Sequence, residues 1–526
     1  MNLRLKSSSR SAVSAGPDGA AERTLFASKD GIYDLRRRAL DDNIRATMSP
    51  QHDNGVAPAI DTFDKIGEAT APNERAAQMR RLLHDPIVPT LLRMAWPNIL
   101  IMLAQASTGL IETFWVARLG TDALAGMALV FPVVMMVQMI ANGAMGGGIA
   151  SAIARALGGG RRDEADALVL HAVVINVALG LGISLLMLAF GRTVYRALGG
   201  TGGELEAALI YSNVVFGGNV LFWLLNGLAA VIRGTGNMIV PAAVICAGVI
   251  FLVPVSPLLI FGFGPIPSLG IAGGGVALLL FYAAGSAVLA WYILSGRNLV
   301  RFRWRRLRWS LLTDILRVGA ISSIQSVQTN FTIALATALV AGVSDVNAIA
   351  GFGTAARLEY LLIPVVFGIG APLVSLVGTN IGAGQKQRAL RIALTGAALA
   401  FALTEVIGLA AAIWPERWLT LFSTQPDMIN VGSAYLRIVG PTYGFFGLGL
   451  SLYFASQGAG RLFWPLACGV ARVIIAVVGG WVALRLTGSL DWMFAALALG
   501  LVVYGLTVAA AIRSGGWFRS STNVLS

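Results

Sequence analysis

The sequence predicts an all-α polytopic membrane protein with twelve transmembrane helices, arranged as two six-helix lobes around a central cavity. Of its 526 residues, 56% are hydrophobic and 12% are charged, and the mean hydropathy is +0.73. Apolar residues gather in continuous runs of about 20 to 25, the length that crosses a hydrocarbon core of about 30 Å. The second half of the chain also repeats the first. Because lipid offers the backbone no hydrogen bonds, continuous runs of this length are predicted to be helices.

Residues 1–85 precede the first apolar run and are polar, with many Ser, Ala, Asp and Arg residues. No apolar h-region follows Met1, so we predict no cleavable secretory signal at this position. We expect a disordered cytoplasmic tail with no assigned function. A start site at Met48 or Met79 is the alternative interpretation.

Twelve apolar segments follow the tail, and each is interpreted as one transmembrane helix. Their approximate bounds are 91–117, 123–152, 166–190, 205–231, 238–262, 269–295, 311–341, 347–379, 388–414, 432–456, 463–486 and 491–513. The predicted organisation is an N-lobe at 86–295, a basic cytoplasmic connector at 296–310, a C-lobe at 311–513 and a cytoplasmic C-terminus at 514–526.

Arginine and lysine residues are concentrated in alternate loops. Besides the connector, one set of loops holds Arg155, Arg161, Arg162, Arg233, Lys386, Arg388, Arg391 and Arg461. The other set holds Arg118, Arg192, Arg196, Arg417 and Arg485. Cytoplasmic loops of membrane proteins carry the excess of basic residues. The asymmetry therefore predicts that both termini are cytoplasmic, in a bacterial-type inner membrane.

The connector reads GRNLVRFRWRRLRW, six arginines among aromatic residues. A nucleic-acid site would use the same residue types, but in a membrane protein this pattern is typical of a cytoplasmic loop at the lipid headgroups. We therefore predict no nucleic-acid partner. Cys246 and Cys468 lie inside apolar runs, and the histidines, His52, His84 and His171, form no metal-ligand pair. We predict no disulfide, metal site or cofactor.

The internal repeat is clearest where RGTGNMIVP, ending at Pro241, recurs as QGAGRLFWP, ending at Pro465, an offset of 465 − 241 = 224 residues. The same offset relates Gly146 to Gly370 and Ser151 to Ser375. Each unit holds an even number of helices, so both units enter the membrane from the same side, related by an axis along the membrane normal. We expect the two lobes to face each other across a cavity.

Pairs of glycines mark the short loops of both repeats: Gly158, Gly160, Gly234, Gly236, Gly382, Gly384, Gly458 and Gly460. Tight turns between antiparallel helices need backbone conformations that glycine adopts cheaply, so we interpret these residues as structural. A phosphate-binding loop would need a preceding strand and a following Walker lysine. Neither is present, and ATP coupling is not supported.

The loop and helix motifs together resemble the multidrug and toxic compound extrusion (MATE) family. The motifs are ETFWVARLGTDALAGMALVFP in the first two segments, GGGRRDEA and GAGQKQRA after segments two and eight, and RGTGN and QGAGR after segments four and ten. The resemblance covers roughly residues 91–513. It implies a transporter, not an enzyme, that exports amphipathic and often cationic organic compounds by alternating access, driven by a proton or sodium gradient.

Glu112 is the first candidate for ion coupling, because an acidic side chain in a membrane span is expensive to ionise and is expected to face a cavity. Gln105, Thr108 and Glu112 are spaced i, i+3, i+7 and share one helical face, where the carboxyl can bind a proton or Na⁺. The resemblance adds that MATE transporters often carry Asp at the position of Glu112 and Gln one heptad earlier. The alternative is a carboxylate near the headgroups, paired with Arg118.

Two departures from the family pattern bear on the coupling ion. Where one branch of the family has an Asp-Pro in segment five, this chain has Ser256 and Pro257. Another branch has acids in segments seven and ten, but here segment seven reads SSIQSVQTN and segment ten has no acid. A C-lobe Na⁺ site of that type is not expected, while Na⁺ at Glu112 stays open.

The remaining polar and aromatic residues of the segments line the cavity or bridge helices in our interpretation. Glu359 pairs with Arg472 or with a cationic substrate, and the role of Glu405 is open. Substrate-cavity candidates are Gln138, Asn142, Asn226, Trp223, Gln325, Gln328, Asn330, Glu359 and Tyr443, with Met135, Met136, Met139 and Phe222 as further wall residues. Pro97 shares segment one with Glu112, which predicts that segment one is the mobile helix.

These observations predict a secondary active antiporter that exports amphipathic, cationic organic compounds in exchange for protons or Na⁺. The alternatives are a lipid-linked glycan flippase and another small-metabolite exporter with the same core. A flippase needs a broad cationic cavity, yet few basic residues lie within the segments. An enzyme needs a catalytic constellation that the sequence does not offer. We expect a monomer whose partners are its substrate and the lipid bilayer.

Overall fold

The computed structural model describes residues 75–265, 267–342 and 346–518. The predictions for residues 1–74 and 519–526, the alternative start at Met48 among them, lie outside the described residues. The long elements of the described part are helices that follow the apolar segments, since a helix satisfies its backbone hydrogen bonds internally. The predicted fold class is confirmed.

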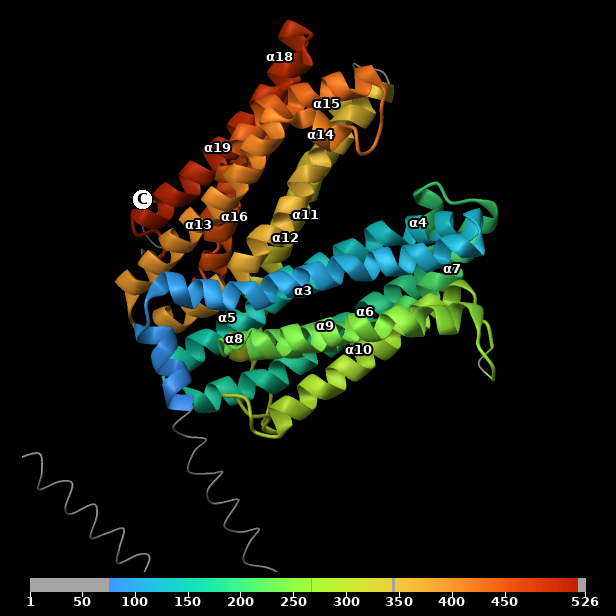
Figure 1. Cartoon of the computed structure of the whole chain (residues 1–526). Helices are drawn as coiled ribbons and strands as arrows, with labels where there is room; N and C mark the ends of the chain where they lie inside the picture. Colours follow the sequence, from blue (N-terminus) through green and yellow to red (C-terminus); the bar gives the residue numbers. More distant parts are fainter. Residues whose placement is uncertain (1–74, 266, 343–345, 519–526) are drawn as a thin grey trace, which may run out of the picture. The chain divides into compact units, whose positions relative to one another are not determined.

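The first six predicted segments form one bundle, the N-bundle, drawn in blue to light green in Figure 1. Its elements are α3 (Ile87–Val116), η1 (Ala117–Leu119), α4 (Thr121–Gln138), η2 (Met139–Met145), α5 (Gly146–Gly158), α6 (Arg162–Ala197), α7 (Gly202–Gly217), α8 (Asn219–Gly234), α9 (Ile239–Phe261) and α10 (Ile271–Leu294). The π-helical η2 joins α4 to α5, so the three form one span.

The last six segments form the C-bundle, yellow to red in Figure 1. Its elements are α11 (Trp309–Ala341), α12 (Val346–Gly382), α13 (Lys386–Ile413), α14 (Pro415–Leu419), α15 (Pro426–Val439), η3 (Gly440–Thr442), α16 (Tyr443–Ala459), α17 (Phe463–Val473), η4 (Ile474–Gly479), α18 (Gly480–Thr487) and α19 (Leu490–Arg513). A second π-helical turn, η4, joins α17 to α18.

Among the described residues, eleven spans are long and apolar enough to cross a membrane, and α7 with α8 makes a twelfth that is bent by 47°. The bend falls at Gly218, within the segment 205–231 that the sequence predicted as one transmembrane helix. The irregular turn η3 interrupts the corresponding span of the C-bundle, between α15 and α16. Both repeats therefore break their fourth span near the same position, which the apolar pattern does not reveal.

Part of the predicted polar tail is structured. Residues 75–84 are helical, and Leu82 is 4% exposed. Its carbonyl accepts from Asn380 Nδ2 of the C-bundle at 3.2 Å, while Gln78 donates to the Thr235 carbonyl of the N-bundle at 3.1 Å. The expectation of disorder to residue 85 is thus wrong for this helix, because contacts with both bundles order it.

The loop glycines fall into two groups. Gly160, Gly236, Gly384 and Gly460 have φ angles of 72°, 84°, 74° and 69°, so they make the left-handed turns that the sequence predicted. Gly158, Gly234, Gly382 and Gly458 instead lie against neighbouring backbone, where a Cβ would overlap carbonyl atoms. Both groups are structural, but the second group permits close helix packing rather than turning the chain.

The two bundles contact each other at the end that carries these loops, which we call the closed end. There α12 packs against α5, and α16 also contacts α5. Arg155 of α5 forms an ion pair with Asp314 of α11, in which its Nη2 atom lies 2.9 Å from both carboxylate oxygens, and its Nη1 donates to the Gly458 carbonyl at 3.2 Å. Helix α3 also crosses between the bundles, since it packs on both α9 and α12.

Candidate functional site

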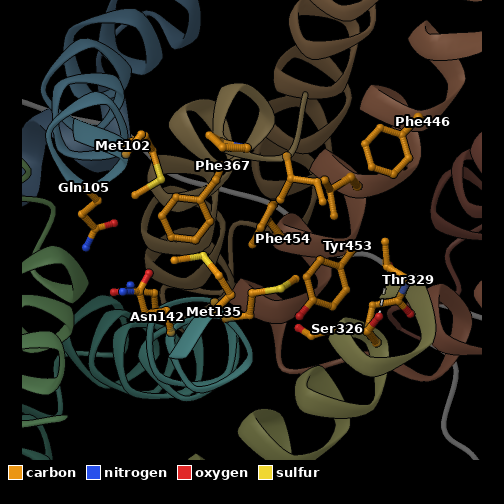
Figure 2. A pocket seen from close by; sticks show the side chains of 18 residues that line it. Met102, Gln105, Met135, Asn142, Ser326, Thr329, Phe367, Phe446, Tyr453 and Phe454 are labelled. Atoms are coloured by element: carbon orange, nitrogen blue, oxygen red, sulfur yellow. Dashed lines mark hydrogen bonds between the residues drawn. The ribbon is translucent and has the colours of Figure 1, made fainter. Parts of the chain in front are cut away.

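A central pocket of about 270 Å³ lies between the bundles. It is lined by Met102, Gln105, Ala106, Met135, Gln138, Met139, Asn142, Gly143, Gln325, Ser326, Thr329, Ile363, Pro364, Phe367, Phe446, Leu450, Tyr453 and Phe454. Figure 2 shows methionine and aromatic side chains facing one another across this space, with Gln105 and Asn142 on one side and Ser326 and Thr329 on another. Such soft and aromatic groups suit bulky, partly apolar ligands.

The pocket residues come from both bundles. Helices α3 and α4 with η2 supply one wall, and α11, α12 and α16 supply the other. Pro364 lies in the wall, and as a proline it gives its helix no backbone donor at that position. The described residues of the lining include amides and hydroxyls but no acidic or basic side chain. A cationic substrate, as the sequence led us to expect, therefore meets no carboxylate here.

Several predicted cavity residues do line this pocket. Gln138, Asn142 and Gln325 are among them, together with Met135 and Met139. The pocket also contains residues that were not predicted from the sequence, namely Ser326, Thr329, Met102, Phe367, Phe446, Tyr453 and Phe454. A usable signal existed for the first two, because Gln325, Ser326 and Thr329 follow helical spacing and form one polar stripe.

The other predicted cavity residues lie elsewhere. Trp223 is fully buried in the N-bundle, and Asn226 donates to the Phe222 carbonyl of its own helix at 2.9 Å. Asn330 likewise donates to the Ser326 carbonyl at 2.9 Å. Gln328 and Tyr443 do not line the central pocket either. Helix α8, which carries Trp223 and Asn226, contributes no described residue to the central pocket, so these two side chains serve packing within the N-bundle.

Glu112 is 1% exposed inside the N-bundle rather than in the central pocket. Ser256 of α9, Tyr211 of α7 and Tyr282 of α10 surround it. A Cβ on Gly274 of α10 would lie 2.5 Å from its Oε2 atom, so this glycine makes room for the carboxyl. Neither carboxylate oxygen has a hydrogen-bond partner among the described residues. The snorkelling alternative with Arg118 does not fit, because Arg118 stacks on Phe114 and Trp115 instead.

The three residues of α3 that were predicted to act together have different neighbours and do not form one site. Gln105 lines the central pocket, Thr108 donates to the Ala104 carbonyl at 3.1 Å, and Glu112 lies between α3, α9 and α10. Helix α3 therefore holds the pocket residue Gln105 and the buried carboxyl of Glu112 two turns apart, in two different sites.

A second buried acid is already paired. Glu359 of α12 accepts from Arg472 of α17 at 2.6 Å and from the Tyr435 hydroxyl at 3.3 Å. Both charged side chains are less than a tenth exposed. The predicted pairing is present, and it leaves no free carboxylate there for a cationic substrate. Glu405 accepts from the backbone N–H of Gly444 at 2.7 Å, within the C-bundle.

These elements define a multi-span membrane transporter with a pocket between two repeated bundles. The sequence model of the MatE family matches residues 97–258 and 322–482, one stretch in each bundle. The chain belongs to the MatE family. The match also confirms the internal repeat, since the same model fits equivalent parts of both halves.

Two curated relatives show how the family is described. The chain is 28% identical over 405 residues to a FAD transporter of Shewanella oneidensis, covering 76% of this chain and 88% of that protein. It is 24% identical over 418 residues to a probable multidrug resistance protein NorM of Thermotoga maritima, covering 78% and 85%.

Solved structures share the fold. An outward-facing multidrug resistance MATE family transporter superposes with a TM-score of 0.75 at 22% identity, over 84% of this chain and 98% of that one. A MATE protein in the straight conformation gives a TM-score of 0.76 at 23% identity, with 84% and 99% covered. The predicted twelve-helix fold of the family is thereby confirmed.

Proposed function

We propose that this chain is a secondary antiporter of a bacterial inner membrane, which exports amphipathic organic compounds from the central pocket in exchange for protons. The closed end and both termini are cytoplasmic in this proposal. The observation that carries it is Glu112, a buried carboxyl without a partner, on α3, a helix that also lines the pocket and packs against both bundles. That arrangement joins an ion-binding group to a part of the substrate site.

Proton binding supplies the energy difference between states. An ionised carboxyl buried in a membrane protein without a counter-ion or hydrogen bonds is strongly unfavourable, and a proton removes that penalty. A state in which water reaches Glu112 favours ionisation, whereas the buried arrangement favours the protonated form. A ligand shifts a conformational equilibrium only if it binds one state more tightly than the other. Protons that enter from outside bind Glu112 more tightly in the buried state, and they therefore shift the population toward that state.

Helix α3 is suited to transmit that change. Pro97 removes one backbone donor from its first half, and Asn98 donates to the Phe367 carbonyl of α12 at 2.9 Å. Phe367 itself lines the pocket. A movement of α3 on protonation of Glu112 thus alters the contact with a pocket-lining residue of the opposite bundle. This supports the expectation that the first span is the mobile one.

The proton is preferred over Na⁺ as the coupling ion on the basis of the donor set. Na⁺ binds best to several oxygen ligands, but Glu112 is the one carboxylate that the described part of the chain places at this site, with the Ser256 hydroxyl beside it. The other buried membrane acid of comparable depth, Glu359, is neutralised by Arg472. A single carboxyl is sufficient to carry a proton.

The pocket chemistry supports organic substrates with aromatic or apolar parts. The names of the relatives, a FAD transporter and a multidrug resistance protein, agree with bulky organic compounds. The glycan flippase alternative is not favoured, because it needs a broad cationic cavity and, among the described residues, none that lines the central pocket is basic.

The test is dye efflux from membrane vesicles with an imposed ΔpH or ΔNa⁺. We expect ΔpH to drive export by the wild-type chain and Glu112→Gln to abolish it while folding and dye binding persist. Glu405→Gln is the matched control, because an amide oxygen still accepts from the Gly444 N–H, and efflux should be retained. Unchanged efflux by Glu112→Gln would overturn the role of Glu112, and export driven by ΔNa⁺ alone would replace the proton by Na⁺.

A further inference from the structure

A second, smaller cavity lies beneath the central pocket. Asn142, Gly143, Phe367 and Phe454 line both spaces, so the smaller cavity forms the floor of the larger one. Its volume is about 10 Å³, which is the room that one water-sized oxygen atom needs. The floor cavity therefore admits one end of a ligand whose body occupies the central pocket.

Among the described residues that line the two cavities, Arg233 alone is charged. It lies in the last turn of α8 and is 3% exposed. A Cβ on Gly146 would stand 3.3 Å from its Nη2 atom, so the guanidinium packs against the face of a glycine. Within the described ranges its guanidinium forms no ion pair and donates to no acceptor, whereas its backbone carbonyl accepts from Ser375 Oγ at 2.6 Å and from the Gly236 N–H at 2.9 Å.

A buried cation of this kind is unusual. A guanidinium presents five N–H donors and stays charged in proteins, and burying a charge without a partner is strongly unfavourable. The carbonyl end of α8 offsets part of this through the helix dipole, but that effect reaches about 2 kcal/mol at most. Its five donors are satisfied only if an anion or water enters the floor cavity.

The internal repeat places an uncharged residue at the position equivalent to Arg233. Arg233 corresponds to Gln457, which opens the QGAGR motif of the second repeat. Gln457 lines the same floor cavity, and its Nε2 donates to the Gly143 carbonyl at 2.9 Å and to Ser322 Oγ at 2.9 Å. The two repeat-related side chains thus meet at the floor. In the C-bundle, the Gln457 amide donates to protein acceptors. In the N-bundle, the Arg233 guanidinium donates to none among the described residues.

We propose that Arg233 binds an anionic oxygen of the transported compound, so that the central pocket takes aromatic compounds with a carboxylate or phosphate group. This inference deepens the proposed transport function and rests on the central pocket being its substrate site. The aromatic body lies among the methionine and aromatic side chains, and one anionic oxygen reaches the guanidinium past Phe367 and Phe454. Neither cavity offers an acid to attract a cation, and the buried positive charge repels one.

The test compares two dyes that share a xanthene ring system and differ in charge, anionic fluorescein and cationic rhodamine 123. Binding is measured by fluorescence anisotropy on the purified full chain in lipid nanodiscs, with no ion gradient. We expect fluorescein to bind at least about tenfold more tightly than rhodamine 123, because a buried hydrogen bond to a charged group contributes that much or more.

Variants at the floor separate a binding role from a structural one. Arg233→Gln reproduces the residue of the second repeat and should weaken fluorescein binding about tenfold or more without weakening rhodamine 123 binding. Arg233→Lys keeps the charge and should stay within about threefold of wild type. Arg461→Gln removes an exposed arginine of the equivalent loop in the C-bundle and should change neither affinity.

Equal affinities for the two dyes, or tighter binding of rhodamine 123 by the wild-type chain, would overturn the proposal, and this comparison needs no variant to fold. Retention of full fluorescein affinity by Arg233→Gln would overturn it as well. The gradient assay with Glu112→Gln is independent of both results. Loss of the dye preference together with intact proton-driven efflux rejects the anion site, whereas an intact preference without any driven efflux rejects the antiport.

Discussion

Gly158 and Gly382 occupy equivalent positions of the two repeats, and each lies against the backbone of the opposite bundle. A methyl group on Gly158 would overlap the Thr379 carbonyl of α12, and one on Gly382 would overlap the Arg155 carbonyl of α5. The two spans therefore approach to backbone contact at the closed end. Small residues permit this approach in membrane proteins, where close packing replaces the hydrophobic effect as the force between helices.

The first prediction concerns that contact. Gly158→Ala or Gly382→Ala should separate the bundles at the closed end, since the atoms in the way are backbone and no side chain can move aside. The reporter is a cysteine at Ser151, a fully buried residue of α5, in a chain whose Cys246 and Cys468 are replaced. We expect a water-soluble maleimide to label Ser151→Cys at least about fivefold faster in either alanine variant. A fivefold increase corresponds to a shift of about 1 kcal/mol in the free energy between the closed and open states.

Gly182→Ala is the control for this experiment. Gly182 lies within α6, where a Cβ would meet nothing within 4 Å, so an added methyl group should leave the labelling rate unchanged. Equal rates in all three alanine variants would contradict the assignment of Gly158 and Gly382 as the contact that holds the closed end together.

The architecture could be predicted from the sequence because its determinants are local or periodic. Run length identifies membrane spans, and the recurrence of RGTGNMIVP as QGAGRLFWP identifies the repeat without any tertiary information. The bend at Gly218 and the π-helical turns η2 and η4 were missed. These features depend on how neighbouring helices pack, and apolar residues before and after them carry the same hydropathy signal.

The site could be predicted only in part, for a geometric reason. Helical spacing correctly places Gln105 and Glu112 near one face, but which neighbour that face meets changes along the helix as α3 passes from α12 to α9. Gln105 therefore meets the pocket, while Glu112 meets Ser256 and Tyr282. Arg233 was assigned to a cytoplasmic loop by its charge. Its burial follows from the approach of the two bundles, which no single segment encodes.

A second prediction concerns the buried pair of Glu359 and Arg472. Glu359→Gln or Arg472→Met alone should lower the free energy of unfolding by about 3 kcal/mol, because each leaves a buried charge without its partner. The double variant should lose less than the two single losses combined. Thermal unfolding in detergent, followed by tryptophan fluorescence, measures the three variants against wild type.

The same variants separate structural pairing from substrate binding by Glu359. If the pair serves packing, the double variant binds fluorescein and rhodamine 123 with wild-type affinities once it is folded. Arg472 also lies 5.1 Å from the centre of the Phe446 ring, which lines the central pocket. A change in rhodamine 123 affinity confined to the Glu359→Gln variant would instead assign Glu359 to the substrate.

A third prediction concerns the helix at residues 75–84. Leu82 packs against Gly236 of the N-bundle, and its carbonyl accepts from Asn380 of the C-bundle. Leu82→Ala should lower the free energy of unfolding by about 2 kcal/mol through lost burial. Leu92→Ala, at a position 51% exposed, should have a much smaller effect in the same thermal unfolding experiment. Equal losses would contradict a clamping role for this helix.

The last prediction tests whether the central pocket is the binding site at all. Gly143 lines the pocket, and a Cβ built on it would meet no atom within 4 Å, so a larger side chain fits without disturbing the helix. Gly143→Leu should therefore fold normally and project four carbons into a space of about 270 Å³. We expect the affinity for xanthene dyes to fall at least about tenfold, since a displaced ligand loses more than 1.4 kcal/mol of contacts.

The matched control is Gly182→Leu, which adds the same side chain at a glycine of α6 that is likewise free of neighbours. Because Gly182 lies outside the pocket, this variant should bind both dyes as the wild type does. Wild-type dye affinity in a folded Gly143→Leu variant would place the binding site elsewhere, and with it the route of export.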